Sequence, residues 1–140
     1  ATAIVIVFYL ALTEVLPEAL FNKLFYALYL MTWQYLDKDL GVQTYESLDD
    51  YLPGDCRYIM NPDVHPNTPE WKGENAIQLK DGYYYGHGIG IATEKSIIRT
   101  LNQYRKPGAT RSAYMMDNAV RPGFMYLYGQ YDKYLKESHA

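Results

Sequence analysis

The stretch "WKGENAIQL", residues 71–79, places one carboxylate, Glu74, at the start of an apolar run that is typical of a β-strand. Gly73 and Asn75 flank this glutamate, and Trp71 precedes it by three residues. Charged side chains rarely enter a buried strand without a partner. Glu74 is therefore either a hydrogen-bonded structural carboxylate or a general base whose pKa is raised by a partly apolar site, and the spacing alone leaves both open.

A β-hairpin is predicted to continue from this stretch. Residues 75–79 ("NAIQL") and 83–91 ("YYYGHGIGI") have the composition of strands, and they flank a short turn at 80–82 ("KDG"). This strand–turn–strand pattern is typical of a hairpin. Two more strands are expected, at 56–60 ("CRYIM") and 110–116 ("TRSAYMM"), and a loop with three prolines at 61–70 follows the first of them.

Helices are predicted before these strands. Residues 1–15 form one buried apolar element, whose β-branched residues favour a strand and whose length favours a helix, so that its type stays open. Pro17 suits the first turn of a second helix, which is expected to run to about Trp33. Its apolar side chains recur at three- and four-residue spacing, as on an amphipathic helix: Leu20, Phe21, Leu24, Phe25, Leu28 and Tyr29.

A third helix is predicted after the hairpin, with Thr93 as its N-cap and with "KPG" (106–108) at its end. Its expected inner face is Ile97, Ile98, Leu101 and Tyr104. Residues 118–140 are a tyrosine-rich, charged tail that is expected to be helical from Met125. The order of helices and strands indicates one α+β domain over residues 1–140.

Composition excludes several classes of function. The 140 residues fit one domain, and a net charge of -3 makes a nucleic-acid partner unexpected. The apolar run at the N-terminus is shorter than the ~20 residues that span a bilayer, and no basic residue precedes it, so neither a membrane segment nor a signal peptide is predicted. Position 1 lies inside a hydrophobic element and is not methionine, which indicates a chain cut at the edge of its core.

The polar motifs allow several kinds of site. "GHGIG" (86–90) lacks the context of a phosphate loop, so its glycines are expected to permit a close backbone approach or to turn the strand end. His87 within it is a structural or a site histidine. Cys56, the only cysteine, is expected to be buried and structural because it does not look placed at a helix N-terminus. No metal site is predicted, because the candidates lack metal-ligand spacing: Cys56, Asp63, His65, Glu74 and His87.

Several sequence blocks together carry a family resemblance. They are "ATAIVIVFYLAL" (1–12), "GDC" (54–56), "NPD" (61–63), "WKGENAIQL" (71–79), "GHGIGI" (86–91), "LNQYRKPGA" (101–109) and "RSAYMM" (111–116). In order and spacing they resemble the C-terminal half of the bacterial spore-coat transglutaminases, the small calcium-independent protein-glutamine γ-glutamyltransferases. The resemblance covers roughly residues 1–116, whereas the tail at 118–140 matches less well.

The resemblance implies a fold and a set of site residues. The expected fold is a papain-like, NlpC/P60-type core, with N-terminal helices packed on a short antiparallel sheet. Glu74 of the "GEN" block is implied to be the main catalytic base, paired with a nucleophilic cysteine. His87, expected on the next strand, is implied to support it, and Trp71 and Trp33 are expected to line a tunnel to the thiol. No cofactor is implied.

The same resemblance places the catalytic cysteine immediately before Ala1, preceded by another glutamate. The chain is therefore expected to begin just after its nucleophile and to be inactive by itself. The implied reaction joins glutamine and lysine side chains through a cysteine thioester. The implied partners are spore-coat proteins with reactive Gln and Lys, neither nucleic acid nor membrane, and the implied location is the sporulating cell and then the spore coat.

Two other functions remain open at this point. One is a non-catalytic, tyrosine-rich structural or binding module of the coat, which a chain without a nucleophile would favour. The other is a cell-wall amidopeptidase on the same core. That enzyme needs a Cys–His pair and gives no reason for the "GEN" block, residues 73–75.

Overall fold

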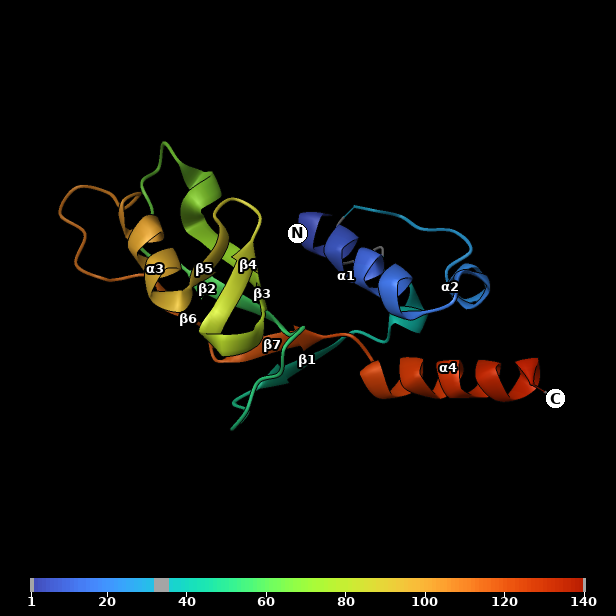
Figure 1. Ribbon diagram of the computed structural model, residues 1–140. Helices are drawn as coiled ribbons and strands as arrows, with labels where there is room; N and C mark the ends of the chain where they lie inside the picture. The colour runs from blue at the N-terminus through green and yellow to red at the C-terminus, as the bar shows by residue number, and fades with distance from the viewer. Residues whose placement is uncertain (1, 32–35, 140) are drawn as a thin grey trace. The chain divides into compact units, whose positions relative to one another are not determined.

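The computed structural model describes residues 2–31 and 36–139. They form two compact units (Figure 1). The first unit combines the residues up to Gln43 with those from Arg121 onward, and the second is Thr44–Val120. The residues that carry the "GEN" and "GHG" blocks all belong to the second unit.

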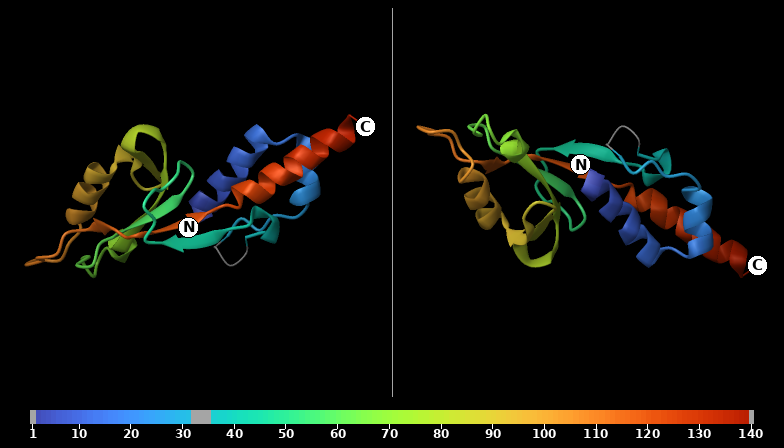
Figure 2. Two further views of the ribbon diagram at one scale, coloured as in Figure 1. Left: turned by 90° about the horizontal axis from the view of Figure 1, so that it is seen from below. Right: turned by 90° about the horizontal axis from the view of Figure 1, so that it is seen from above.

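The first unit is built from helices: α1 (Thr2–Val15), α2 (Glu18–Leu24) and α4 (Phe124–Ser138), with the short 3₁₀ helix η2 (Lys38–Leu40). The N-terminal apolar run is a helix and not a strand. Its buried residues, Ile4, Val5, Phe8, Tyr9 and Leu12, recur at helical spacing, so one face of α1 carries the contacts. α1 and α4 lie side by side (Figure 2), and side chains from both line a common apolar hollow.

The second helix is shorter than predicted. α2 ends at Leu24, so the expectation that it runs to about residue 33 is wrong over residues 25–31. Phe25 leaves the helical path and is buried, with its ring edge-on to that of Tyr9 at a centroid distance of 5.4 Å. This aromatic contact competes with continuation of the helix. Trp33, predicted to line a tunnel, lies outside the described residues.

The second unit is centred on a mostly antiparallel sheet of seven strands in the order β1-β7-β2-β3-β4-β5, with β6 beside β2. The strands are β1 (Gln43–Glu46), β2 (Cys56–Met60), β3 (Gly73–Gln78), β4 (Tyr83–Gly86), β5 (Gly90–Thr93), β6 (Tyr114–Met115) and β7 (Asn118–Arg121). The printed pairings of β2 with β3, β6 and β7, and of β4 with β3 and β5, are antiparallel. The predicted strand at 56–60 and the hairpin across residues 80–82 are confirmed.

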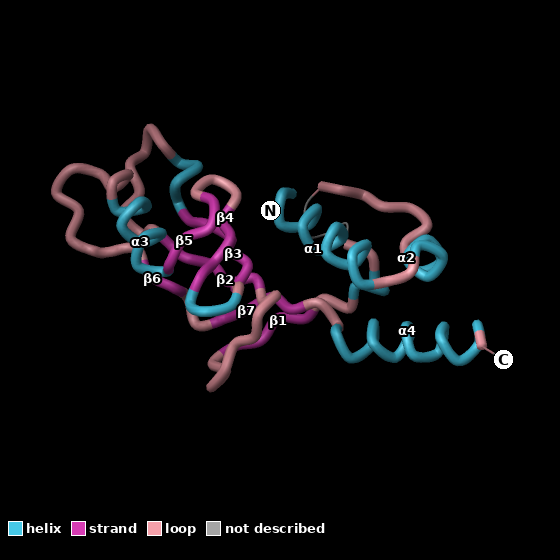
Figure 3. The backbone as a smooth tube through the Cα atoms, viewed as in Figure 1, coloured by secondary structure: helices cyan, strands magenta, loops and turns pink. Residues whose placement is uncertain are grey.

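The predicted strand 83–91 is interrupted by a turn. β4 stops at Gly86, and the chain reverses through residues 86–89 into β5, as the loop between the two strands in Figure 3 shows. The amide of Ile89 donates to the carbonyl of Gly86 at 3.1 Å, and Gly90 has φ 92°. A left-handed residue after a tight turn is typical of three-residue hairpin loops and favours glycine. His87 therefore lies in this β4–β5 turn and not on a strand, which corrects the prediction.

α3 (Glu94–Asn102) covers one face of the sheet. The hydroxyl of Thr93 accepts from the amide of Ser96 at 3.2 Å, which confirms the predicted N-cap. The fully buried Ile97 and Leu101 of this helix form one hydrophobic core with residues outside the helix. Those residues are Ile59, Ala76, Tyr84 and Ala113. Short 3₁₀ helices, η3 (Pro69–Lys72) and η4 (Lys80–Gly82), connect β2 to β3 and β3 to β4.

The C-terminal tail is partly as predicted. The helix expected from Met125 is confirmed as α4, which begins at Phe124. The strand β7 was missed, and the strand expected at 110–116 is only the two residues of β6. β2 holds β6 and β7 in position, because its buried Arg57 donates to the carbonyls of Met116 and Asn118.

The cap of α3 gives a first test. Replacing Thr93 by alanine removes the acceptor for one orphan amide, so the free energy of unfolding is expected to fall by ~1 kcal/mol. Urea denaturation followed by circular dichroism would measure it. Thr110→Ala, in an exposed loop, is the matched control. Equal effects of the two substitutions would contradict the capping role.

Candidate functional site

Glu74, near the start of β3, lies on the face of the sheet that packs against α3. It lies directly opposite Ile59 of β2 and two residues from Ala76, and both of these are fully buried under the helix. Opposite residues in an antiparallel pair, and residues two apart in a strand, share one face. Glu74 thus lies at the end of an apolar stripe on this face, and the glutamate side chain is partly buried there. β3 thus carries a carboxylate at a position whose neighbours on the same face are core side chains.

The carboxylate lies against the β4–β5 turn. A Cβ built on Gly86 would be 2.9 Å from Cγ and 3.2 Å from Cδ of Glu74. A Cβ built on Gly88 would be 3.1 Å from Oε2 of the same side chain. These distances leave no room for a larger residue unless the glutamate moves. The glycines of "GHG" were expected to permit a close approach, and Glu74 is the group that approaches them.

Burial raises the pKa of Glu74 above its ordinary value, because a partly desolvated carboxylate loses hydration. The positive charge that His87 can carry opposes this rise, as do backbone hydrogen bonds from Gly88 and His87. The site therefore combines a dry environment with donors that stabilise the anion. A carboxylate with a raised pKa is a better proton acceptor near neutral pH than a solvated one.

Trp71 forms a wall beside the glutamate. Its ring stacks on that of Tyr104 with a centroid distance of 4.2 Å and an interplanar angle of 1°, and its Cη2 atom would be 3.9 Å from a Cβ on Gly88. The fully buried Asn61 fixes the backbone on both sides of this stack. Its amide donates to the carbonyls of Trp71, at 3.1 Å, and Leu101, at 2.9 Å.

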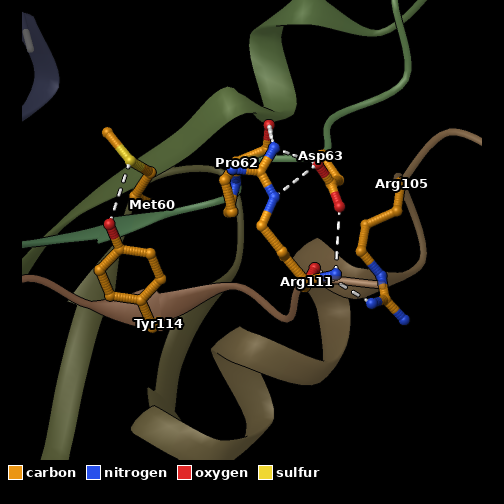
Figure 4. Close-up of polar contacts among 6 residues, drawn as sticks. All are labelled: Met60, Pro62, Asp63, Arg105, Arg111 and Tyr114. Carbon is orange, nitrogen blue, oxygen red and sulfur yellow. Dashed lines mark hydrogen bonds and ion pairs between the residues drawn. The ribbon is translucent and has the colours of Figure 1, made fainter. Parts of the chain in front are cut away.

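The "NPD" block also holds the segment after α3. Asp63 is buried and accepts from the guanidinium of Arg111, including a 3.0 Å bond from Nε, and from the backbone amide of Arg111 at 3.1 Å (Figure 4). Hydrogen bonds from Arg111 hold the pKa of Asp63 down at about 2. Asp63, a metal candidate in the sequence, is thus engaged in an ion pair. No group of three or more metal-ligating side chains occurs in residues 2–31 and 36–139.

His87 is exposed at the tip of the β4–β5 turn. The backbone of His87 and the positive charge that its side chain can carry both act on Glu74. The side chain of His87 is nevertheless exposed, whereas the carboxylate is partly buried. The structure thus brings both predicted site residues, Glu74 and His87, to one place.

Cys56 lies on the other face of the sheet. It is opposite Ile77 and three residues from Ile59, so that its side chain leaves β2 away from the face of Glu74. The thiol is 3 % exposed and contacts the side-chain oxygen of Asn75 at 3.9 Å. Burial raises its pKa to about 12. Its predicted buried, structural position is confirmed.

Asn61, Tyr104 and the Asp63–Arg111 pair are the supporting residues that sequence reasoning missed. Tyr104 was assigned to the inner face of a helix, but α3 ends at Asn102 and Tyr104 reaches Trp71 from the following turn. A buried asparagine next to proline and aspartate in "NPD" was the available signal, since such residues bond to backbone groups.

Cys56 gives a test of thiol reactivity. A buried thiol with a raised pKa is expected to react with a thiol reagent only after unfolding, because the thiolate is the reactive form. Labelling with an aromatic disulfide, followed by absorbance with and without denaturant, would measure this. Labelling of the native chain at the rate of a free thiol would contradict the buried position.

The ion pair of Asp63 gives a test with pH. Because its folded pKa lies below the ordinary value of 3.8, the pair stabilises the fold above pH ~4, and this contribution is lost as the pH falls toward 2. Asp63→Asn and Arg111→Met are both expected to flatten the fall in stability between pH 5 and pH 2. Urea midpoints across this range would show it, and curves parallel to that of the wild type would contradict it.

Comparison with known proteins places this geometry in a family. The sequence profile of the family described as protein-glutamine gamma-glutamyltransferase matches residues 1–132. Proteins of that name from Bacillus mycoides (strain KBAB4) and Bacillus licheniformis are 49% and 43% identical over 121 residues, which is 86% of this chain. The chain spans 43% and 48% of the length of these two relatives.

A solved structure agrees. The transglutaminase from Geobacillus stearothermophilus, without its C-terminal extension, superposes with a TM-score of 0.82 at 54% identity, over 91% of this chain and 59% of that one. Both share helices combined with an antiparallel sheet. No helix of the described residues has the length and apolar character needed to cross a membrane. With a match over most of its length, this chain belongs to the protein-glutamine γ-glutamyltransferase family.

Proposed function

We propose that the whole protein to which this chain belongs is a transglutaminase that forms γ-glutamyl-lysine crosslinks between spore-coat proteins. One observation carries the proposal: the glutamate of the "GEN" block is a partly buried carboxylate held against a glycine turn, in a chain of this family. A carboxylate kept in that way is suited to accept a proton during acyl transfer. A purely structural module has no need of a partly buried carboxylate held in this way.

The proposed reaction has two steps. A cysteine thiolate, which the family resemblance places directly before Ala1, attacks the carboxamide of a protein glutamine, and a thioester forms as the amide nitrogen takes up a proton and leaves as ammonia. A lysine amine of a second protein then attacks the thioester, and the cysteine leaves as a thiolate as the isopeptide bond forms. The amine must lose a proton in this step, and we assign that proton to Glu74. His87 supports the glutamate through its charge.

The fold proposed for the whole protein is a papain-like core of NlpC/P60 type, with the N-terminal helices packed on the antiparallel sheet. Residues 1–140 would form one catalytic domain, in which 118–140 is a divergent tail. A thiolate at the N-terminus of a helix gains from the helix dipole, which suits a nucleophile that precedes α1. Trp71 would line the approach to it. No cofactor takes part, and the sporulating cell and then the spore coat are the proposed locations.

The base assignment is tested in the full-length protein. Glu74→Gln keeps the shape of the side chain and removes the base, so turnover in calcium-free buffer is expected to fall ~10²–10⁴-fold. Incorporation of a fluorescent amine into a glutamine-rich protein is the measurement. Glu70→Gln, four residues earlier and exposed, is the matched control and should retain activity.

A second glutamate, which the resemblance places before the nucleophile, can mask part of that loss. The assay is therefore repeated with both carboxylates replaced. Activity close to that of the wild type in this double variant would eliminate Glu74 as the base.

The 140-residue chain alone is expected to incorporate no amine. Its one thiol, Cys56, is buried, has a raised pKa and points away from the face of Glu74. The same fluorescent-amine assay on the purified chain is the measurement. Incorporation that Cys56→Ser abolishes would mean that the nucleophile and the site are assigned wrongly.

A further inference from the structure

We propose that the β4–β5 turn, residues 86–89, is a carboxylate cradle, in which Gly86 and Gly88 are positioning residues that fix the direction of the Glu74 side chain. They act through the glutamate and touch no substrate. The catalytic consequence rests on the proposed function, whereas the cradle itself rests on geometry alone. The cradle gives this hairpin a reason to carry glycine on both sides of its histidine.

The two glycines limit different parts of the glutamate. Gly86 faces the stem and the nearer oxygen: a Cβ there would lie 2.9 Å from Cγ, 3.2 Å from Cδ and 3.4 Å from Oε1. Gly88 faces the other oxygen, with its Cβ position 3.1 Å from Oε2. Both carboxylate oxygens and the stem thus rest on backbone, and the bare backbone sets where the head of the side chain lies.

The turn also supplies donors. Backbone hydrogen bonds from Gly88 and His87, two successive residues, lower the pKa of Glu74 against the effect of burial. Successive backbone amides of a turn form concave sites that bind anions. Among the described residues of the second unit, the ionisable groups that interact with Glu74 are His87 on the turn, and Tyr58 and Cys56 on β2. Of these, only His87 can favour the anion by its charge.

The cradle has a fixed shape because its ends are tied. Gly86 and Gly90 are partners across β4 and β5, and the amide of Ile89 closes the turn on the carbonyl of Gly86. Trp71, fixed by its stack on Tyr104, stands at the outer side near Gly88. The turn that contacts the carboxylate is therefore held in place at both ends.

Two glycines, one in the cradle and one in the neighbouring β3–β4 connection, offer a matched pair of substitutions. Gly88→Ala places a methyl group against Oε2 at a backbone conformation that alanine accepts, since its φ lies outside the left-handed region. Gly82→Ala, in the β3–β4 connection, strains a left-handed backbone, because Gly82 has φ 78°, yet its Cβ would meet nothing within 4 Å. The first displaces the carboxylate, whereas the second strains a turn outside the cradle.

The test measures the titration of Glu74 by ¹³C NMR in the full-length protein with labelled glutamate, assigned with Glu74→Gln. Gly88→Ala is expected to raise the pKa of Glu74 by about one unit, because the anion loses hydrogen bonds while staying desolvated. Gly82→Ala is expected to leave it unchanged. Equal shifts in the two variants, or no shift in Gly88→Ala, would overturn the cradle.

Kinetics separate the cradle from the proposed function. In Gly88→Ala, kcat/KM is expected to fall ~10–10²-fold through misplacement of the base, with the acid limb of its pH profile moved to higher pH. Gly86→Ala, which displaces the stem, should lose at least as much, and Gly82→Ala should keep the wild-type profile. A shifted NMR titration with an unmoved kinetic profile would refute Glu74 as the base and leave the cradle standing.

If Gly88→Ala does not fold, an ester in place of the Gly88 amide, made by semisynthesis, removes one donor without adding an atom. It is expected to raise the pKa of Glu74 in the same direction. An unchanged pKa in the ester variant would overturn the role of the Gly88 amide as a donor.

Discussion

A carboxylate partly withdrawn from water is the feature on which the rest of this site depends. Glu74 occupies the end of a sheet face whose other positions are core residues, so its ionised form is costly unless donors replace the lost hydration. Backbone amides of a turn can do this, but only if the carboxylate lies against bare backbone. The glycines at 86 and 88 follow from this requirement, since a Cβ at either would force the glutamate to shift.

The remainder of the unit keeps this contact rigid. Thr93 starts α3 directly after β5, and Ile97 and Leu101 fasten the helix to the strands. At the far end of the helix, Asn61 binds the carbonyls of both Leu101 and Trp71, which couples the helix end to the aromatic wall beside the glutamate. The network is polar but buried, and its orientation is set by bonds to the backbone.

The thiol in this chain plays a different part. Strand alternation places Cys56 and Glu74 on opposite faces of the sheet, so that a thiol–carboxylate pair between them is geometrically excluded. The proposed reaction therefore does not use Cys56 as its nucleophile. Cys56 instead fills a buried strand start beside Asn75.

Local sequence determined the elements whose signals are local: the hairpin around residues 80–82, the capped helix after Thr93, and the unusual carboxylate in "GEN". Hydrophobic periodicity could not decide between helix and strand for residues 1–15, nor show that Phe25 would leave its helix to meet Tyr9. Nor could it break the apolar run 83–91 at His87, because a turn and a strand share that composition. Only the tertiary structure joined Glu74 to Gly86 and Gly88, since strand pairing and a reversing turn bring together groups that the chain keeps apart.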